Sequence, residues 1–271
     1  MRVRRSFVDG PHGQIHVRST AAVAGVEPLA CLHATAYSSQ SFLPLMAALD
    51  GRRQVIAPDA PGYGDSDAPP APPSIADYAA ALAPAITAAG APVTLLGYHT
   101  GAYIAAELAI TRPDLVARLV LIGIPYFQAL DLSFWRAKLA ARHVLGDTLD
   151  QFDERWRYFM TERHSCVTLE RGFANFVDEL KAWPNGWQAH EAMFAWDSDA
   201  RLPSVPCPTL VLNPSGHLAP ASRAAARLIP DCVIEERPDW TGPVLESAAA
   251  EIAESIEAWL TPVPQSVLAA I

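Results

Sequence analysis

The chain has 271 residues, a hydrophobic fraction of 51%, a charged fraction of 18% and a formal net charge of -9. This length and composition are typical of one packed domain with an insertion, and they exclude an intrinsically disordered chain. The acidic charge balance excludes nucleic acid as a partner, because phosphate binding needs a basic face and the only basic cluster is Arg2, Arg4 and Arg5.

Targeting signals and the cysteine pattern indicate where in the cell the protein is expected. No apolar segment follows the N-terminal arginines, and the longest apolar run has the length of a strand, so we expect neither a signal peptide nor a membrane span. The four cysteines are scattered without a C-x-x-C pair, which predicts reduced thiols and a cytoplasmic protein. The expected partner is a small-molecule substrate or ligand, with no cofactor, no metal and no membrane, and a homodimer is left open.

Strands and helices alternate through the first half of the chain. Short apolar runs predict strands, and longer segments that begin at capping residues predict helices. The predicted elements are an antiparallel hairpin at 4–8 and 14–18, strands at 28–33, 53–58, 93–96 and 119–124, and helices at 40–48, 74–89 and from 100 onward. This order predicts a mostly parallel sheet with helices on both faces.

The alternation stops between residues 126 and 201, where aromatic-rich amphipathic helices are predicted. It resumes with a strand at 209–213, a helix at 221–229, a strand at 232–236 and a last helix at 243–260. We therefore predict an α/β core formed by residues 1–125 and 202–271, and a helical lid, residues 126–201, inserted between the sixth and seventh strands. His164 and His190 on this segment are expected at the surface.

The stretch from Val93 to Tyr103 carries the strongest local signal. An apolar run breaks at Gly97 and continues as a small-residue helix, so that Gly97 and Gly101 bracket His99 at the spacing G-x-X-x-G. Glycine lets the chain turn sharply and lets the helix approach the sheet. His99 is then expected at the apex with φ > 0, a strain on the order of 1 to 3 kcal/mol that function usually maintains. Its imidazole can act as a base, an acid or a nucleophile.

Three motifs together resemble those of the α/β-hydrolase superfamily. They are Leu32-His33 followed by a small residue, Pro58-Asp59-Ala60-Pro61-Gly62-Tyr63-Gly64-Asp65-Ser66, and Gly97-Tyr98-His99-Thr100-Gly101. The resemblance implies an α/β fold with a mostly parallel eight-stranded sheet flanked by helices. The family nucleophile falls on His99, the family acid on Gly216 and the family histidine on Thr241, so no Ser-His-Asp triad is found at the usual places.

The predicted site is centred on His99. Backbone N–H groups of Thr100 and of the Ala34–Thr35 turn are expected to form an oxyanion hole. A relocated acid/base pair of His217 and Asp239, beside the vacant positions, is expected to reach His99. The residues expected to line the pocket are Tyr37, Tyr98, Trp240 and Thr241. A metal site of His33, His99 and His217 is a lesser alternative, because His33 is usually a scaffold residue in this fold.

Two functions remain open from the sequence. The first is a cofactor-independent enzyme that acts on a small, largely apolar carbonyl compound with His99 as base or nucleophile. Its reaction is hydrolysis of an ester or C–C bond, or a lyase or isomerase step. The second is a non-catalytic binding protein that kept the pocket and lost the chemistry.

Overall fold

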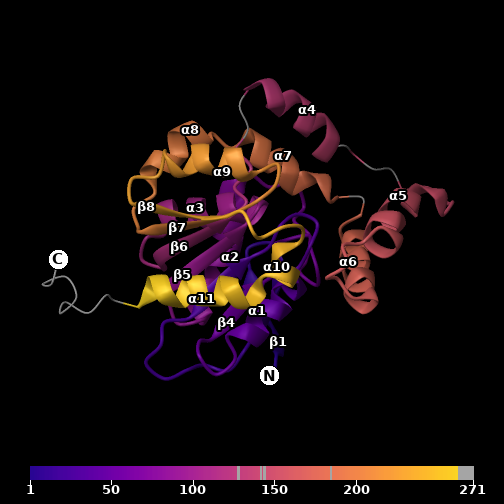
Figure 1. Ribbon diagram of the computed structural model, residues 1–271. Helices are drawn as coiled ribbons and strands as arrows, with labels where there is room; N and C mark the ends of the chain where they lie inside the picture. The colour runs from indigo at the N-terminus through magenta and orange to yellow at the C-terminus, as the bar shows by residue number, and fades with distance from the viewer. Residues whose placement is uncertain (127–128, 141, 143–144, 184, 262–271) are drawn as a thin grey trace, which may run out of the picture.

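An eight-stranded sheet runs through the computed structural model, which describes residues 1–126, 129–140, 142, 145–183 and 185–261 (Figure 1). The strands are β1 (Arg4–Gly10), β2 (Gly13–Ser19), β3 (Leu29–Leu32), β4 (Val55–Pro58), β5 (Val93–Tyr98), β6 (Val116–Ile122), β7 (Thr209–Pro214) and β8 (Cys232–Arg237). Their order is β1-β2-β4-β3-β5-β6-β7-β8. Only β2 runs antiparallel to its neighbours, β1 and β4. The predicted mostly parallel sheet is therefore confirmed.

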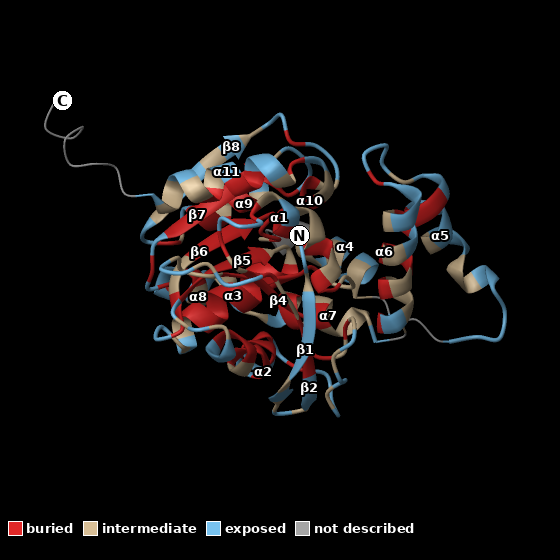
Figure 2. Cartoon of the chain, turned by 90° about the horizontal axis from the view of Figure 1, so that it is seen from below, coloured by how far each residue is buried: buried red, intermediate tan, exposed pale blue. Residues whose placement is uncertain are grey.

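Helices cover both faces of this sheet. One face is packed by α2 (Ile75–Ala88), α3 (Thr100–Thr111) and α9 (Ala219–Ala226), and the other by α1 (Leu43–Ala48), α10 (Val244–Ser247) and α11 (Ala249–Leu260). Leu95 of β5 belongs to the first core cluster and its neighbour Leu96 to the second, because successive side chains of a strand point to opposite faces. Figure 2 shows the resulting buried layers in red at the centre of the molecule.

Several element boundaries differ from the predictions. The helix predicted at 40–48 begins with a 3-10 turn, η1 (Ser39–Phe42), and α1 starts only at Leu43. The helix predicted at 243–260 is broken at Ala248, whose φ of -131° separates α10 from α11. By contrast, Ser74 and Asp77 form a capping box, which is why α2 begins where the sequence predicts.

The segment between β6 and β7 is helical, and we refer to it as the helical insertion. Its elements are α4 (Ala129–Leu139), η2 (Asp150–Phe152), α5 (Asp153–Trp156), the π-helix η3 (Arg157–Thr161), α6 (Leu169–Ala182), α7 (Trp187–Ala195), α8 (Ser198–Arg201) and the 3-10 turn η4 (Leu202–Ser204). In Figures 1 and 2, α5 and α6 lie to one side of the sheet, while α7 lies closer to it. The elements η3 and α6 share a small apolar core of their own, centred on Phe159, Met160 and Phe176.

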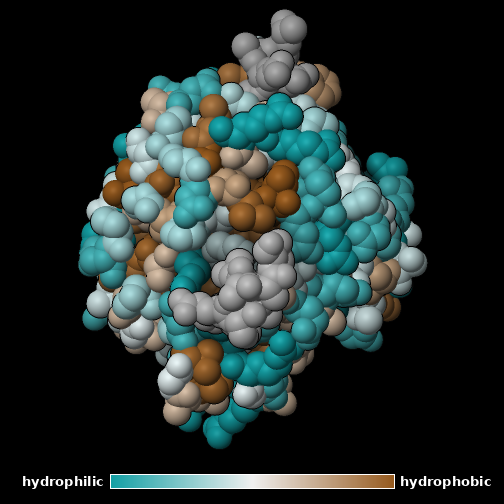
Figure 3. Space-filling model, turned by 60° about the vertical axis from the view of Figure 1, so that its left-hand side comes forward, coloured by the Kyte–Doolittle hydropathy of each residue, from teal (hydrophilic) through white to brown (hydrophobic). Residues whose placement is uncertain are grey.

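One sheet edge remains exposed. β8 ends the strand order, and its Val233 and Ile234 side chains are 53% and 37% exposed. Figure 3 brings this side of the molecule forward and shows hydrophobic groups within a largely hydrophilic surface. The homodimer stays a prediction. No helix in the described part of the chain is both long and apolar enough to cross a membrane.

Candidate active site

The β5–α3 turn places His99 between the sheet and the helical insertion. His99 has φ 52° and ψ -117°, and it is the one non-glycine residue with positive φ in the described chain. The flanking glycines are required by close contacts. A Cβ on Gly97 would lie 2.5 Å from the Cα of Ala102, and a Cβ on Gly101 would lie 2.2 Å from the carbonyl oxygen of Leu32. The helix therefore sits directly on β5 and β3, which forces the chain through the strained conformation at His99.

The His99 ring lies in a confined environment. The Tyr98 ring meets it edge-on at a centroid distance of 4.3 Å, and a Cβ on Gly123 would lie only 3.0 Å from its Cδ2. Burial, followed by the neighbouring His217 and His190, lowers the pKa of His99 to about 4. The imidazole is consequently neutral at neutral pH, with a lone pair on one ring nitrogen.

Backbone donors lie next to this ring. Thr100 is the first residue of α3, so its N–H has no partner within the helix, and it points from the positive end of the helix dipole. In the described chain, neither this N–H nor that of Thr35 makes a backbone hydrogen bond. The Thr35 hydroxyl donates to the Thr100 hydroxyl at 2.8 Å, which ties the loop after β3 to the start of α3. The N–H groups of Thr100 and Thr35 are thus left without a backbone acceptor on two residues that this hydrogen bond joins.

Comparison with known proteins gives the family. A profile of the Alpha/beta hydrolase family matches residues 29–255, which is most of the chain. The chain belongs to the alpha/beta hydrolase family. It is 29% identical over 215 residues to a Klebsiella pneumoniae protein provisionally named as the carbamate hydrolase RutD, and the alignment covers 74% of this chain and 78% of the relative.

Solved structures support the fold of this alpha/beta hydrolase. An esterase from Thermogutta terrifontis has a TM-score of 0.73 at 22% identity, over 95% of this chain and 98% of the esterase. The enol-lactonase from Burkholderia xenovorans has a TM-score of 0.73 at 22% identity, over 95% of this chain and 100% of the lactonase. The eight-stranded architecture predicted from the sequence motifs is that of these neighbours.

The alpha/beta hydrolase does not bring His217 and Asp239 together. His217 is exposed and stacks on Trp135 at 5.2 Å, close enough to His99 to affect the pKa of that ring. Asp239 instead forms an ion pair with Arg237 at 2.9 Å. That pairing leaves the Asp239 carboxylate committed to a half-buried arginine two residues away, so the expected acid/base pair is not assembled.

Trp240 and Thr241 also lie apart from His99. Trp240 is only 4% exposed and packs among the residues beneath α10 and α11. Together with Asp239 and His164, these two residues line a hollow of about 150 Å³, and His99 is not among its lining residues. The predicted pocket residues therefore divide between two places.

Tyr37 and Tyr98 lie on the His99 side. Tyr37 packs edge-on against Phe159 of η3, with a centroid distance of 6.2 Å. Burial raises the pKa of both tyrosines, and the Tyr158 hydroxyl raises them further. Both phenols stay neutral at neutral pH, and Tyr37 joins the loop after β3 to the helical insertion.

His33 is fixed by the backbone. Its Nε2 accepts from the N–H of Ala60 at 2.9 Å, which places the ring proton on Nδ1, and Nδ1 donates to the Ala34 carbonyl oxygen at 2.8 Å. No lone pair of this ring is left for a metal ion. The alternative of a site formed by His33, His99 and His217 is therefore wrong.

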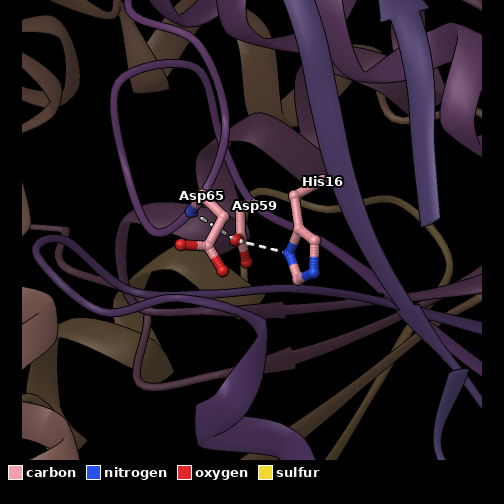
Figure 4. A group of neighbouring side chains, drawn as sticks. All are labelled: His16, Asp59 and Asp65. Carbon is pink, nitrogen blue, oxygen red and sulfur yellow. Dashed lines mark hydrogen bonds and ion pairs between the residues drawn. The ribbon is translucent and has the colours of Figure 1, made fainter. Parts of the chain in front are cut away.

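A second cluster, shown in Figure 4, joins His16, Asp59 and Asp65, whose ligand-type atoms lie within 4.8 Å of one another. The Asp59 carboxylate accepts from His16 Nδ1 at 2.8 Å, from the N–H of Ser39 at 2.7 Å and from the N–H of Asp65 at 2.9 Å. Burial would raise the pKa of Asp59, but these donors outweigh it and lower the pKa to about 2. With its oxygens already engaged, Asp59 holds the loop that follows β4 and is not a metal ligand.

His190 and Met193 of α7 lie near the site although the sequence did not predict them there. His190 is half-buried, contrary to the surface position predicted for it, and burial, with a smaller effect of Arg155, lowers its pKa to about 4 although the Leu139 carbonyl opposes this. The Met193 sulfur lies 3.9 Å from the Thr100 hydroxyl, which donates to it. Only the tertiary placement of α7 reveals these residues, since their spacing on an amphipathic helix carries no functional signal.

Proposed function

We propose that this alpha/beta hydrolase cleaves small acyl compounds, with His99 as the nucleophile. The single observation that carries the proposal is a neutral imidazole at the strained apex of the β5–α3 turn. An imidazole with a pKa of about 4 is a weak general base, because a general base works best when its pKa is near the operating pH. Its neutral nitrogen is nevertheless available for attack on an acyl carbon.

The proposed reaction has two steps. A His99 nitrogen attacks the carbonyl carbon, and the oxyanion accepts hydrogen bonds from the N–H groups of Thr100 and Thr35. Collapse breaks the acyl bond to the leaving oxygen or nitrogen, which takes a proton from water. The hydroxide formed removes the proton from the other ring nitrogen, and a neutral acyl-imidazole remains. Water then hydrolyses this intermediate, releasing the acid and regenerating the free ring.

The relatives support acyl chemistry in general. Their names describe a carbamate hydrolase, an esterase and an enol-lactonase, all of which act on a carbonyl carbon bonded to oxygen or nitrogen. In the same proposal, residues 126–201 act as a lid over the core formed by residues 1–125 and 202–261, since α7 of this segment supplies His190 and Met193. Positions 262–271 of the predicted core lie outside the described residues.

The test is acylation and turnover. We expect a panel of small activated esters, enol-lactones and carbamates to contain a substrate, and we expect His99→Ala to lower its kcat/KM by at least about a hundredfold. Mass spectrometry after a short reaction with an activated acetyl ester is expected to find the acetyl group on His99. His164→Ala removes an exposed imidazole of the helical insertion and serves as the matched control. Unchanged turnover in His99→Ala would refute the role of His99.

A ligand-binding protein without chemistry is the second candidate. It is favoured by the His99 ring itself, which forms no hydrogen bond with a carboxylate or hydroxyl in the described chain and so lacks the orienting partner usual for a catalytic imidazole. Thermal stabilisation by acyl compounds without any turnover would support this candidate.

A further inference from the structure

Met193, whose sulfur accepts from the Thr100 hydroxyl, also lines a second cavity. It has a volume of about 220 Å³ and lies between the first turn of α3, the loop after β6, and the segment that joins α7 to α8. Tyr103, Tyr126 and Trp196 contribute aromatic rings to its wall, and Met193 contributes its thioether. Drug-sized ligands occupy cavities of roughly 300 to 1,000 Å³, so this one accommodates a single small group.

The mouth of the cavity is acidic. Asp197 and Asp199 line it and are exposed, and none of the described residues that line the cavity is basic. Asp199 accepts from the Tyr126 hydroxyl at 2.6 Å, and Asp197 accepts from the N–H of Ala200 at 3.1 Å. Neither carboxylate forms an ion pair with a described cation. Each therefore keeps its negative charge uncompensated beside an aromatic wall.

The negative charge of Asp199 helps to raise the pKa values of both tyrosines in the cavity wall. Tyr126 has its pKa raised, first by its hydrogen bond to Asp199. Tyr103 is buried, and after burial the nearby Tyr126 and Asp199 also raise its pKa, although a hydrogen bond with Ser198 opposes them. The hydroxyl of Tyr103 donates to the Pro125 carbonyl oxygen at 3.2 Å, and with their raised pKa values both phenols stay neutral at neutral pH.

We propose that this cavity binds an ammonium group carried on a short apolar or aromatic scaffold. Two uncompensated carboxylates at the mouth recognise the cation, and the aromatic and thioether wall receives the apolar part. Its wall residue Tyr103 lies four residues after His99, which is about one helical turn along α3. Tyr103 and His99 therefore lie on the same face at the start of α3, and for substrates of the proposed reaction the cavity selects acyl compounds that carry an amine. That last step rests on the proposed function, whereas the binding does not.

The test uses two probes of the same shape. 2-Phenylethylamine is a cation at neutral pH and 2-phenylethanol is not, so titration calorimetry with both isolates the effect of charge. At low salt we expect the amine to bind about tenfold more tightly than the alcohol, and we expect added salt to reduce the difference. Neither probe has a hydrolysable bond, so a protein that fails to turn over esters can still pass this test.

Variants that remove single carboxylates test which residues bind the ammonium group. Asp199→Asn and Asp197→Asn are each expected to weaken binding of the amine several-fold while leaving the alcohol unchanged. Asp9→Asn makes the same change of net charge on exposed β1 and is expected to have no effect. Tyr126→Phe removes the hydrogen bond to Asp199 but keeps its charge, so binding of the amine is expected to persist within about twofold. Equal binding of the two probes, binding of neither, or full binding of the amine by the Asp197→Asn/Asp199→Asn double variant would each overturn the proposal.

Discussion

His99 combines a strained backbone with a ring that stays neutral, and the two properties have separate causes. The backbone is forced by the close approach of α3 to β3 and β5, which requires glycine at 97 and 101 but leaves the apex free to carry a side chain. The ring is neutral because it is half-buried and because His217 and His190 oppose a positive charge on it. A side chain that is costly to hold in this conformation is expected to contribute to function.

The pH dependence of turnover follows from the lowered pKa. If the neutral ring is the reactive form, kcat/KM is constant above about pH 5 and falls as the pH drops through about 4, where His99 gains a proton. An imidazole with the ordinary pKa of 6.5 would instead place the acidic limb near pH 6.5. Initial rates from pH 3.5 to 8, with circular dichroism to confirm folding at each pH, separate the two cases. A limb near 6.5 would show that the ring in solution is not desolvated.

The backbone strain at His99 can be measured without any activity. His99→Ala keeps a Cβ at positive φ, whereas His99→Gly relieves it, and both variants lose the ring. Glycine relieves about 1 to 3 kcal/mol of backbone strain, but its greater freedom in the unfolded chain costs up to about 1 kcal/mol. The free energy of unfolding of His99→Gly is therefore expected to exceed that of His99→Ala by about 1 kcal/mol. Urea unfolding measures the difference. An Ala variant that is more stable than the Gly variant by up to about 1 kcal/mol would mean that the turn holds no strain.

At the scale of elements, the β5–α3 unit depends on Gly101. A Cβ there would meet the carbonyl carbon and oxygen of Leu32 at 2.7 and 2.2 Å, and these backbone atoms cannot rotate away. Gly101→Ala is therefore expected to destabilise the protein by about 2 to 3 kcal/mol, in spite of the higher helix propensity of alanine. Gly146→Ala, whose Cβ would lie 3.7 Å from Gln151, is the control and is expected to change stability little in urea unfolding. Similar losses in the two variants would contradict the packing described for α3.

Polar contacts of Arg171, Ala174 and Asp178, which are spaced i, i+3, i+7 on one face of α6, hold this helix on the core. Arg171 bonds Glu246 at 2.9 Å and the Gln40 carbonyl oxygen at 3.1 Å. The Gln40 amide donates to the carbonyl oxygen of Ala174 at 2.9 Å, and the Ser38 hydroxyl donates to Asp178 at 2.7 Å. Three of these four contacts are made by Ser38 and Gln40, which lie at the end of the loop after β3 and in η1, and the same loop carries Thr35. The position of α6 is thus tied to the loop that supplies a proposed oxyanion donor.

Arg171→Ala is expected to loosen α6 without unfolding the sheet. It removes a half-buried ion pair and a bond to the backbone, so amide hydrogen exchange in residues 169–182 is expected to accelerate about tenfold while β5 and β6 remain protected. Arg157→Ala breaks an exposed ion pair of 3.6 Å in the same insertion and is expected to leave exchange unchanged. If both variants exchange alike, the contacts of Arg171 do not hold the helix.

Elements could be predicted from the sequence more completely than the site. Apolar strand runs, the Ser74 cap and the paired glycines are local signals, and the strands, α2 and the β5–α3 turn were placed from them within a few residues. The surroundings of His99 could not be predicted, because they come from α7 and from the loops after β6 and β7, which are distant in the sequence. His190 in particular is indistinguishable from a surface histidine until α7 is packed against the core.

Across the whole molecule, burial of titratable groups links stability to pH. His99 and His190 both have a pKa of about 4 in the folded chain against 6.5 for an ordinary histidine. Between these values the unfolded chain binds more protons, so their contribution to stability is complete above pH 6.5 and is lost as the pH falls through about 4. The lowered pKa of Asp59 affects stability only at lower pH, between 3.8 and about 2. The raised pKa of buried Asp178 offsets part of the loss of stability that the histidines cause as the pH falls.

Acid lability between pH 6.5 and 4 is therefore expected to come from these two imidazoles. Without solvent screening, each pKa shift would change the free energy of unfolding by about 3 kcal/mol. Because both rings are only half-buried and solvent screens them, we expect a change of about 1 to 2 kcal/mol from each histidine. His190→Gln removes one titration and is expected to flatten the fall of Tm across this range by about half, whereas His164→Gln removes an exposed ring and leaves it unchanged. The measurement is thermal unfolding at intervals of half a pH unit. A wild-type Tm that stays level down to pH 4 would mean that neither ring is desolvated in solution, and the neutral nucleophile proposed at His99 would lose its physical basis.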